Sequence, residues 1–298
     1  MRARRFAVVG DPVAHSKSPA MHAAAYRALS LPHRYEAVRA TADELPAIVE
    51  ALRRGAYDGL NVTVPHKERA LALADEVQPA ARAIGAANTL VRSADGHVVA
   101  HNTDAPALAA EIAILVGDTT PAAGVTHGGP AGAELSLAAL DALAGRGAPL
   151  PVLRGATGLV LGAGGASRAA VAALELLGAA VIVRSRRQPG WAPSREVEAR
   201  VRAVVQATSA GMTGADPGEA VATVVDWEAL PHGAVAIDLV YSPPETPFLR
   251  AARARGMRCT NGLGMLVRQG ALAFELWLGQ PAPLGAMLAA VRGGSTAA

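Results

Sequence analysis

The chain has 298 residues, of which 51% are hydrophobic, and this length is ample for two packed cores and long for one. Its net charge of +3 and its 3% of aromatic residues argue against a nucleic-acid stacking surface and suit a phosphorylated small molecule. The single Cys259 excludes an internal disulfide framework, and the first residues do not resemble a signal peptide. Because no apolar run approaches the roughly 18 residues of a membrane span, we expect a cytoplasmic protein without membrane contact.

Short apolar runs alternate with helical patterns over the first 116 residues, which predicts an α/β fold with a parallel-type sheet. Ser18 before Pro19 predicts a helix N-cap, and Thr41 with Glu44 predicts a capping box. We expect strands at 6–10, 35–38 and 59–63, a hairpin at 89–93 and 97–101, and helices at 18–29, 41–54, 67–74, 79–84 and 105–116.

Residues 117–157 hold eight glycines and four prolines around one helical piece at 134–143, and we interpret them as an inserted loop. An apolar run at 157–161, the glycine turn at 162–169 and a helical stretch to 177 then follow one another. In this order, backbone N–H groups and the helix dipole can hold a pyrophosphate. A second strand is expected at 180–183, before a compressed segment at 188–202. Further strands are expected after it at 203–206 and 234–238, and helices at 246–254, 264–278 and 284–292.

Four polar clusters in the first 104 residues, at 10–19, 61–67, 85–89 and 101–104, lie at the predicted ends of strands, where open sheets bind ligands. Taken singly, each has a structural explanation. Ser18 could be only an N-cap with Ser16 a turn residue, Lys67 a solvated helix residue and Asp104 a helix cap. The combination of the four favours a ligand site, in which the two serine hydroxyls could bind a carboxylate.

These strings, together with the glycine loop and the segments 207–212, 238–243 and 261–270, resemble those of the shikimate dehydrogenase family. The resemblance covers most of the chain. It implies reversible NADPH-dependent reduction of 3-dehydroshikimate to shikimate, a step of aromatic amino-acid biosynthesis. It also implies a small-molecule substrate as the partner, in a monomer or a homodimer.

The order of the motifs indicates two domains, because substrate strings occur both before and after the nucleotide motifs. We expect an N-terminal α/β substrate-binding and catalytic domain made of residues 1–104 and 265–298. A Rossmann-like NADP-binding domain would comprise residues 105–264, including the insertion, with a cleft between the domains.

The resemblance assigns roles to individual residues. Lys67 matches the catalytic lysine, whose ammonium would stabilise the charge that grows on the carbonyl oxygen and supply the proton. Asp104 would orient Lys67, and the sequence leaves open which of the two formally transfers the proton. Ser16 and Ser18 would hold the substrate carboxylate, and the other expected substrate contacts are Thr63, Asn88, Tyr241 and Gln269.

The expected cofactor is NADP. In the segment 183–187 no acidic residue is available for a ribose 2′-hydroxyl, and Ser185, Arg186 and Arg187 occupy the place where the family has Asn-Arg-Thr. A basic surface turn is the alternative explanation. The remaining expected cofactor contacts are Gly162, Ala163, Gly164, Gly165, Ala166, Thr208, Gly262 and Met265.

The chain departs from the family pattern in three places: the long insertion, a short span from 187 to 203, and Gln206 where asparagine is common. The short span predicts that the sheet of the cofactor domain lacks one helix-and-strand repeat that the family usually has. Two alternatives remain at this level: a quinate/shikimate dehydrogenase using NAD(P), or a non-catalytic ligand-binding paralogue, which the presence of Lys67 and Asp104 disfavours. The spacing of His15, His66 and His101 predicts no metal site.

Overall fold

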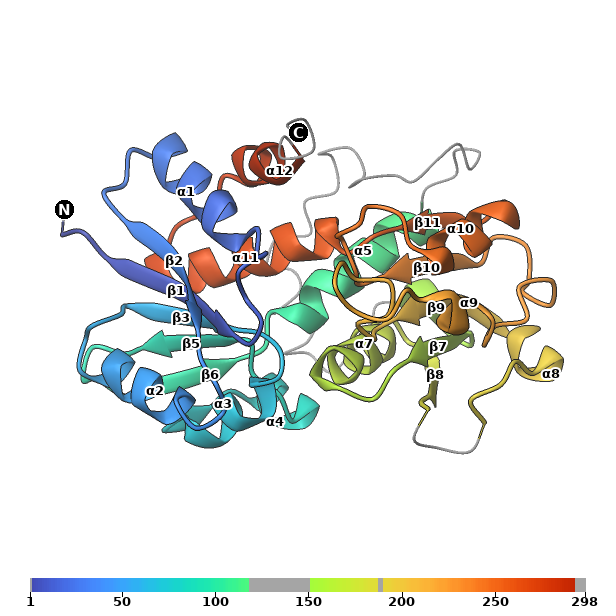
Figure 1. The fold of residues 1–298 in the computed structure, drawn as a ribbon, viewed down its shortest axis with the longest axis horizontal. Coiled ribbons are helices and arrows are strands. Elements are labelled where there is room, and N and C mark those ends of the chain that lie inside the picture. Colours follow the sequence, from blue (N-terminus) through green and yellow to red (C-terminus); the bar gives the residue numbers. More distant parts are fainter. Residues whose placement is uncertain (1, 118–150, 187–189, 293–298) are drawn as a thin grey trace. The chain divides into compact units, whose positions relative to one another are not determined.

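The computed structural model describes residues 2–117, 151–186 and 190–292, so the expected helical piece at 134–143 and Arg187 lie outside the described residues. The chain divides into two compact units (Figure 1). The first comprises Met1–Asp104 and Leu266–Ala298, and the second comprises Ala105–Met265. Within the described ranges, no helix is long and apolar enough to cross a membrane.

The first unit is built on a six-stranded sheet in the order β2-β1-β3-β5-β6-β4. Its strands β1, β2 and β3 are parallel, whereas β5 runs antiparallel to both β3 and β6. The sheet is therefore mixed, because the expected hairpin joins it through β5. The strands are β1 (Arg5–Gly10), β2 (Arg34–Arg39), β3 (Gly59–Val62), β4 (Glu76–Val77), β5 (Thr89–Arg92) and β6 (Val98–His101).

Helices cover both faces of this sheet, with α2, α3 and α4 on one face and α1, α11 and α12 on the other (Figure 1). On the first face, Leu45 and Leu52 of α2 belong to a buried cluster with Leu60 and Leu90 of the sheet. On the second face, Phe6 of β1 stacks on Trp277 of α11. The helices are α1 (Ser18–Ala28), α2 (Leu45–Arg53), α3 (Lys67–Leu73), α4 (Pro79–Ile84), α11 (Leu263–Leu278) and α12 (Leu284–Arg292).

Two predicted helix N-caps are wrong. Lys17, not Ser18, is the N-cap of α1, and Ser18 is a buried first residue of the helix. The Ser16 hydroxyl accepts the Ser18 N–H at 3.2 Å and so does what a capping side chain would do. In α2 only half of the predicted capping box forms. The Glu44 carboxylate accepts the Thr41 N–H at 2.7 Å, but the helix itself begins only at Leu45.

The second unit contains a five-stranded sheet in the order β11-β10-β9-β7-β8, with all neighbours parallel. Buried residues of its strands pack with Phe248 and Leu249 of α10. The strands are β7 (Thr157–Leu161), β8 (Ala180–Arg184), β9 (Val201–Gln206), β10 (Val235–Asp238) and β11 (Arg258–Thr260). The helices are α5 (Asp104–Gly117), α7 (Gly165–Leu176), α8 (Arg195–Glu198), α9 (Glu219–Ala222) and α10 (Pro247–Ala254), with a 3₁₀ turn at Pro151–Leu153.

In the described part of this sheet β8 is an edge strand that pairs with β7 alone, as the short span after it predicts. Among the described residues between β8 and β9, the single-turn helix α8 is the only helix or strand. The sequence did not predict β4, α8, α9 or β11, because two to four residues are too few for a hydrophobic period to show.

Gln206, the departure from the family pattern, joins the ends of β9 and β10. Its Nε2 donates to Asp238 Oδ1 at 3.1 Å and to the Ala210 carbonyl at 2.9 Å. The fully buried Asp238 also accepts the Thr246 hydroxyl at 2.5 Å and the Val240 N–H at 2.9 Å. Burial raises the pKa of Asp238 to about 7, and the hydrogen bonds from Thr246 and Val240 oppose this rise only in part.

The raised pKa predicts that the protein loses stability as the pH rises. The pKa in the folded state lies above the ordinary value of 3.8, so the contribution of Asp238 is fully present below about pH 4 and is lost through pH 7. In the unaltered protein we expect the free energy of unfolding to fall by about 2–4 kcal/mol between pH 4 and pH 8, and Asp238→Asn should abolish this fall. Urea unfolding over this range measures it. The control is Asp43→Asn, whose carboxylate is 98% exposed; equal pH slopes in both variants would contradict the assignment.

Candidate functional site

The topology of the first unit explains why the four polar clusters converge. Strands β1, β3 and β6 run in the same direction, because β1 pairs parallel with β3 and both β3 and β6 pair antiparallel with β5. The loops after these three strands therefore leave from one edge of the sheet, the one at which the carboxyl ends of these strands lie. Strand β5 begins at that same edge. Ser16, Lys67 and Asp104 follow the three strands, and Asn88 directly precedes β5.

Lys67 and Asp104 form a close ion pair at this edge. Lys67 Nζ lies 2.6 Å from Asp104 Oδ2, although the two residues are 37 positions apart in the sequence. Their side chains are only 13% and 6% exposed. Lys67 is the first residue of α3, where a positive charge opposes the helix dipole, so the aspartate compensates a charge that the helix itself disfavours.

Asn88 fixes the second oxygen of the aspartate. Its Nδ2 donates to Asp104 Oδ1 and to Thr103 Oγ1, both at 2.9 Å, and its Oδ1 accepts the Thr103 N–H at 2.7 Å. The Asn102 amide adds a further restraint, since its Oδ1 accepts the Asp104 N–H at 3.1 Å and its Nδ2 donates to the Ala86 carbonyl at 2.9 Å. The carboxylate is thereby held in one orientation with respect to the lysine.

A buried hydrogen-bond network extends from Asn88 toward the serine loop. Asn61 Nδ2 donates to the Asn88 carbonyl at 3.2 Å, and Asn61 Oδ1 accepts the Tyr35 hydroxyl at 2.7 Å. Burial raises the pKa of the Tyr35 hydroxyl well above its ordinary value, and the nearby Ser18 side chain opposes this rise. At the opposite end of the network, Gln269 Oε1 accepts from Asn88 Nδ2 at 3.4 Å.

The structure thus brings together Lys67, Asp104, Asn88 and Gln269. Asn61 connects Asn88 to Tyr35, and Ser18 lies near Tyr35. Ser16 and the half-buried Thr63 lie in the loops at the same edge and, within the described residues, do not bond to Lys67 or Asp104. Sequence reasoning did not assign a role to Tyr35, which is one of a few aromatic residues and has no local motif. Asn61 and Thr103 lie within strings that the sequence did single out.

In the second unit the predicted glycine loop connects β7 to α7. Gly162 has a φ of +128°, and a Cβ there would lie 3.1 Å from the Ala207 carbonyl oxygen, so only glycine fits. Gly164 is the N-cap of the twelve-residue α7, and Ala163, Gly165 and Ala166 flank it in a half-exposed to exposed turn. Backbone N–H groups at such a helix terminus can hold a phosphate.

The other expected cofactor residues of the described chain belong to the same unit, in loops except for Met265, which lies in the first turn of α11. Ser185 is buried directly after β8, and Arg186 is 68% exposed, with its Nη1 3.9 Å from Asp216 Oδ2. Thr208 follows β9, whereas Gly262 lies too close to the Leu239 carbonyl for any side chain, and Met265 is buried. Tyr241, expected to contact substrate, belongs to this second unit and lies in the loop after β10.

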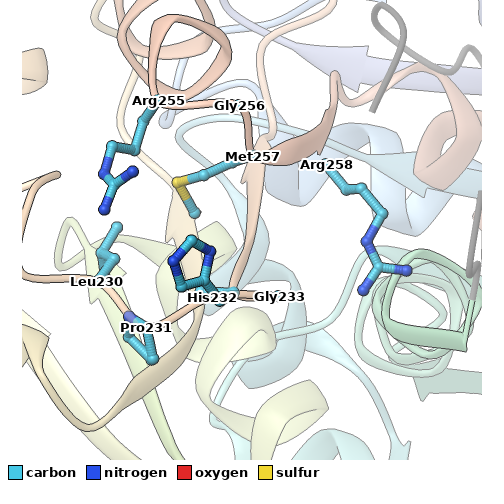
Figure 2. A pocket seen from close by; sticks show the side chains of 9 residues that line it. Leu230, Pro231, His232, Gly233, Arg255, Gly256, Met257 and Arg258 are labelled. Carbon is cyan, nitrogen blue, oxygen red and sulfur yellow. The ribbon is translucent and has the colours of Figure 1, made fainter. Parts of the chain in front are cut away.

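A small pocket in the second unit lies away from these loops (Figure 2). Its cavity of about 160 Å³ is lined by residues 230–234 and 255–258, which precede β10 and β11. The glycine loop follows β7, and all these strands are parallel, so the pocket lies at the other edge of the sheet. It is not the nucleotide site. Among the described residues, no group of three or more His, Cys, Asp or Glu side chains could hold a metal ion.

A parallel nucleotide-type sheet with a glycine loop, in one chain with a unit that carries a buried lysine–aspartate pair, is typical of two-domain α/β oxidoreductases that use a nicotinamide cofactor. Comparison with known proteins shows which family of these oxidoreductases the chain resembles. The family model for the shikimate dehydrogenase substrate binding domain matches residues 8–90, and that for the shikimate 5'-dehydrogenase C-terminal domain matches residues 262–292.

The chain is 40% identical to a shikimate dehydrogenase (NADP(+)) of Thermus thermophilus, with 97% of this chain and 98% of that protein covered. It is 37% identical to the enzyme of the same name from Methylobacterium radiotolerans, over 91% of this chain and 90% of the relative. A crystal structure of the Thermus thermophilus enzyme with NADP(H) and shikimate matches at a TM-score of 0.73 and 38% identity, covering 97% and 99% of the two chains. The chain belongs to the shikimate dehydrogenase family, which confirms the resemblance seen in the sequence.

The network predicts that Asn88 is needed for stability as well as for geometry. Asn88→Ala leaves the buried Thr103 N–H without its acceptor and Asp104 Oδ1 without a donor. We expect the free energy of unfolding to fall by about 2–3 kcal/mol, measured by urea unfolding. As a control, Gln78→Ala removes an amide whose Nε2 contacts the exposed Glu76. A loss no larger than in that control would show that the amide does not support the fold.

Proposed function

We propose that the chain reversibly reduces 3-dehydroshikimate to shikimate with NADPH, in the shikimate pathway of aromatic amino-acid biosynthesis. The observation that carries the proposal is the Lys67–Asp104 pair at 2.6 Å. It stands in a chain that aligns over nearly its whole length with NADP-dependent shikimate dehydrogenases. A non-catalytic paralogue has no need to retain a desolvated ion pair at the strand ends, where the polar loops meet.

The proposed chemistry needs one proton donor beside the ketone oxygen. The nicotinamide supplies a hydride to the carbonyl carbon, and the C=O bond becomes a C–O–H group when the oxygen takes a proton from the Lys67 ammonium. Asp104 keeps that ammonium in place and shares the proton of the hydroxyl in the reverse direction. Only two of the 28 lysine and arginine residues are lysines. Arginine would stay protonated and could not act as a donor, which is consistent with lysine at position 67.

The proposed substrate contacts follow the chemistry of a hydroxylated ring carboxylate. Ser16 and Ser18 hold the carboxylate, while Thr63, Asn88, Gln269 and Tyr241 contact the hydroxyls or the reacting centre. Except for Tyr241, these residues belong to the first unit, and the proposed cofactor residues belong to the second. This division supports a substrate domain of residues 1–104 and 265–298 and an NADP domain of residues 105–264.

The glycine loop at 162–166 would hold the pyrophosphate, and Thr208, Gly262 and Met265, which directly follows the NADP domain, would contact the rest of the cofactor. Ser185, Arg186 and Arg187 would bind the 2′-phosphate, since the segment 183–187 itself contains no carboxylate to repel it. We also infer a cytoplasmic enzyme that acts as a monomer or a homodimer. Its single cysteine, which is buried, is compatible with a reducing compartment.

Replacement of Lys67 tests the catalytic assignment. For Lys67→Ala we expect kcat to fall by about 10²–10⁴-fold, because the proton donor and the charge at the oxygen are lost, with little change in KM for shikimate. Lys67→Arg keeps the charge and should be nearly as slow. Shikimate-dependent reduction of NADP, followed by absorbance, measures both. Arg69→Ala, on the same helix, is the control, and normal turnover of Lys67→Ala would refute the role.

Replacement of Arg186 tests the cofactor assignment. We expect Arg186→Ala to lower kcat/KM for NADPH about ten-fold, the cost of one charge-assisted hydrogen bond, without lowering that for NADH. Steady-state rates with each cofactor, and with shikimate and quinate in the reverse direction, provide the measurement. Arg200→Ala serves as the control, because Arg200 is exposed and pairs with the likewise exposed Glu196 on the neighbouring turn. Equal use of NADPH and NADH by the unaltered protein would contradict the preference.

A further inference from the structure

A buried ion pair lies at the end of the edge strand of the second unit, outside all the residues assigned above. Arg184, the last residue of β8, makes two parallel contacts with Glu198 of α8: Nη1 to Oε1 at 2.5 Å and Nη2 to Oε2 at 3.0 Å. Their side chains are only 5% and 0% exposed. A two-point contact of this kind fixes the orientation of both groups as well as their separation.

Further hydrogen bonds anchor both members of the pair. The Arg184 guanidinium donates to the Val224 carbonyl at 2.8 Å, and the Glu198 carboxylate accepts the Ser194 and Asp226 N–H groups at 3.1 and 3.2 Å. Burial alone would raise the pKa of Glu198, but the contacts with Arg184 and the Asp226 N–H outweigh it and hold the pKa below its ordinary value. Glu198 is therefore ionised at neutral pH.

The same carboxylate also holds the residue that directly precedes the proposed phosphate-binding side chains. Arg184, whose guanidinium binds Glu198, is followed at once by Ser185 and Arg186. In addition, the Arg184 carbonyl accepts the Gly162 N–H at 2.8 Å, so the same residue is bonded to the first glycine of the pyrophosphate loop.

We propose that Arg184 and Glu198 are positioning residues for recognition of the cofactor 2′-phosphate: the pair holds Ser185 and Arg186 at a fixed place beside the glycine loop. The inference rests on the proposed use of NADP. In this sheet β8 pairs with β7 alone among the described strands, so no further strand of the described chain restrains the segment that leaves it. The ion pair supplies that restraint through side chains instead (Figure 1 shows β8 at the sheet edge and α8 beyond it).

The inference also gives Arg184 a structural role, and not a direct contact with the ligand. The Arg184 guanidinium is 5% exposed and is bonded to Glu198 and Val224, whereas the Arg186 side chain is 68% exposed. An arginine that contacts phosphate directly has to present its guanidinium to solvent before binding, and of these two only Arg186 does. Arg184 would therefore act through the position of its neighbours.

The test is nucleotide binding by the purified full-length protein, with adenosine 2′,5′-bisphosphate and adenosine 5′-monophosphate as probes in calorimetry. Glu198→Gln removes the charge and one of the two parallel contacts while keeping the size of the side chain. We expect the preference for the 2′-phosphorylated probe to fall about ten-fold, as for loss of a charge-assisted contact, with little change for the monophosphate. The ratio of kcat/KM for NADPH over NADH should fall in parallel.

Glu196→Gln is the matched control, since Glu196 lies on the same short helix with an 85% exposed side chain. Arg184→Lys, which retains the charge but cannot make two parallel contacts, gives a second test if Glu198→Gln fails to fold. A variant with a lower melting temperature and an unchanged probe preference would overturn the inference and leave the pair purely structural. If the unaltered protein bound both probes equally, this result would contradict the proposed preference for NADP. It would thereby also overturn the inference, which rests on that preference.

Discussion

The contact between the Lys67 ammonium and the Asp104 carboxylate is the constraint on which the rest of the first unit depends. Two charges that are removed from water destabilise a fold unless their partners are close and fully hydrogen-bonded. Here the lysine begins a short helix after β3 and the aspartate begins a helix after β6, so the two strand ends must lie at the same edge. The antiparallel β5 between them meets this requirement, and Asn88 at its start completes the coordination of the aspartate.

The same constraint explains why the polar side chains around the ion pair are connected to one another. A buried amide or hydroxyl is stabilised by a partner, and in this network Asn88 is bonded to Asn61 and Asn61 to Tyr35. A network of this kind is rigid, because a shift of any member leaves another unpaired. The proposed reacting end of the substrate is therefore positioned by one connected set of side chains.

In the second unit, buried side-chain contacts hold the loops that follow the strands. Its strands are short and its edge strand β8 has one partner among the described strands, so the polar loops that follow the strands are held by side chains. Gln206 and Asp238 join the loops after β9 and β10, and Arg184 with Glu198 joins the segment after β8 to α8. Glutamine in place of asparagine at 206 has the additional reach to bond both Asp238 and the Ala210 carbonyl.

The sequence by itself determined the fold class, the family, the nucleotide turn and the strings that carry Lys67, Asn88 and Asp104, because hydrophobic period, glycine spacing and local polar strings are properties of neighbouring residues. Only the tertiary structure decided that Lys67 and Asp104 touch, that Asn61 links Tyr35 to Asn88, and that Arg184 is paired with Glu198. It also placed the N-cap of α1 at Lys17 and made the first sheet mixed. These features depend on which strand ends share an edge and on which buried group satisfies which other, and such pairings join residues far apart in the chain, where no local pattern records them.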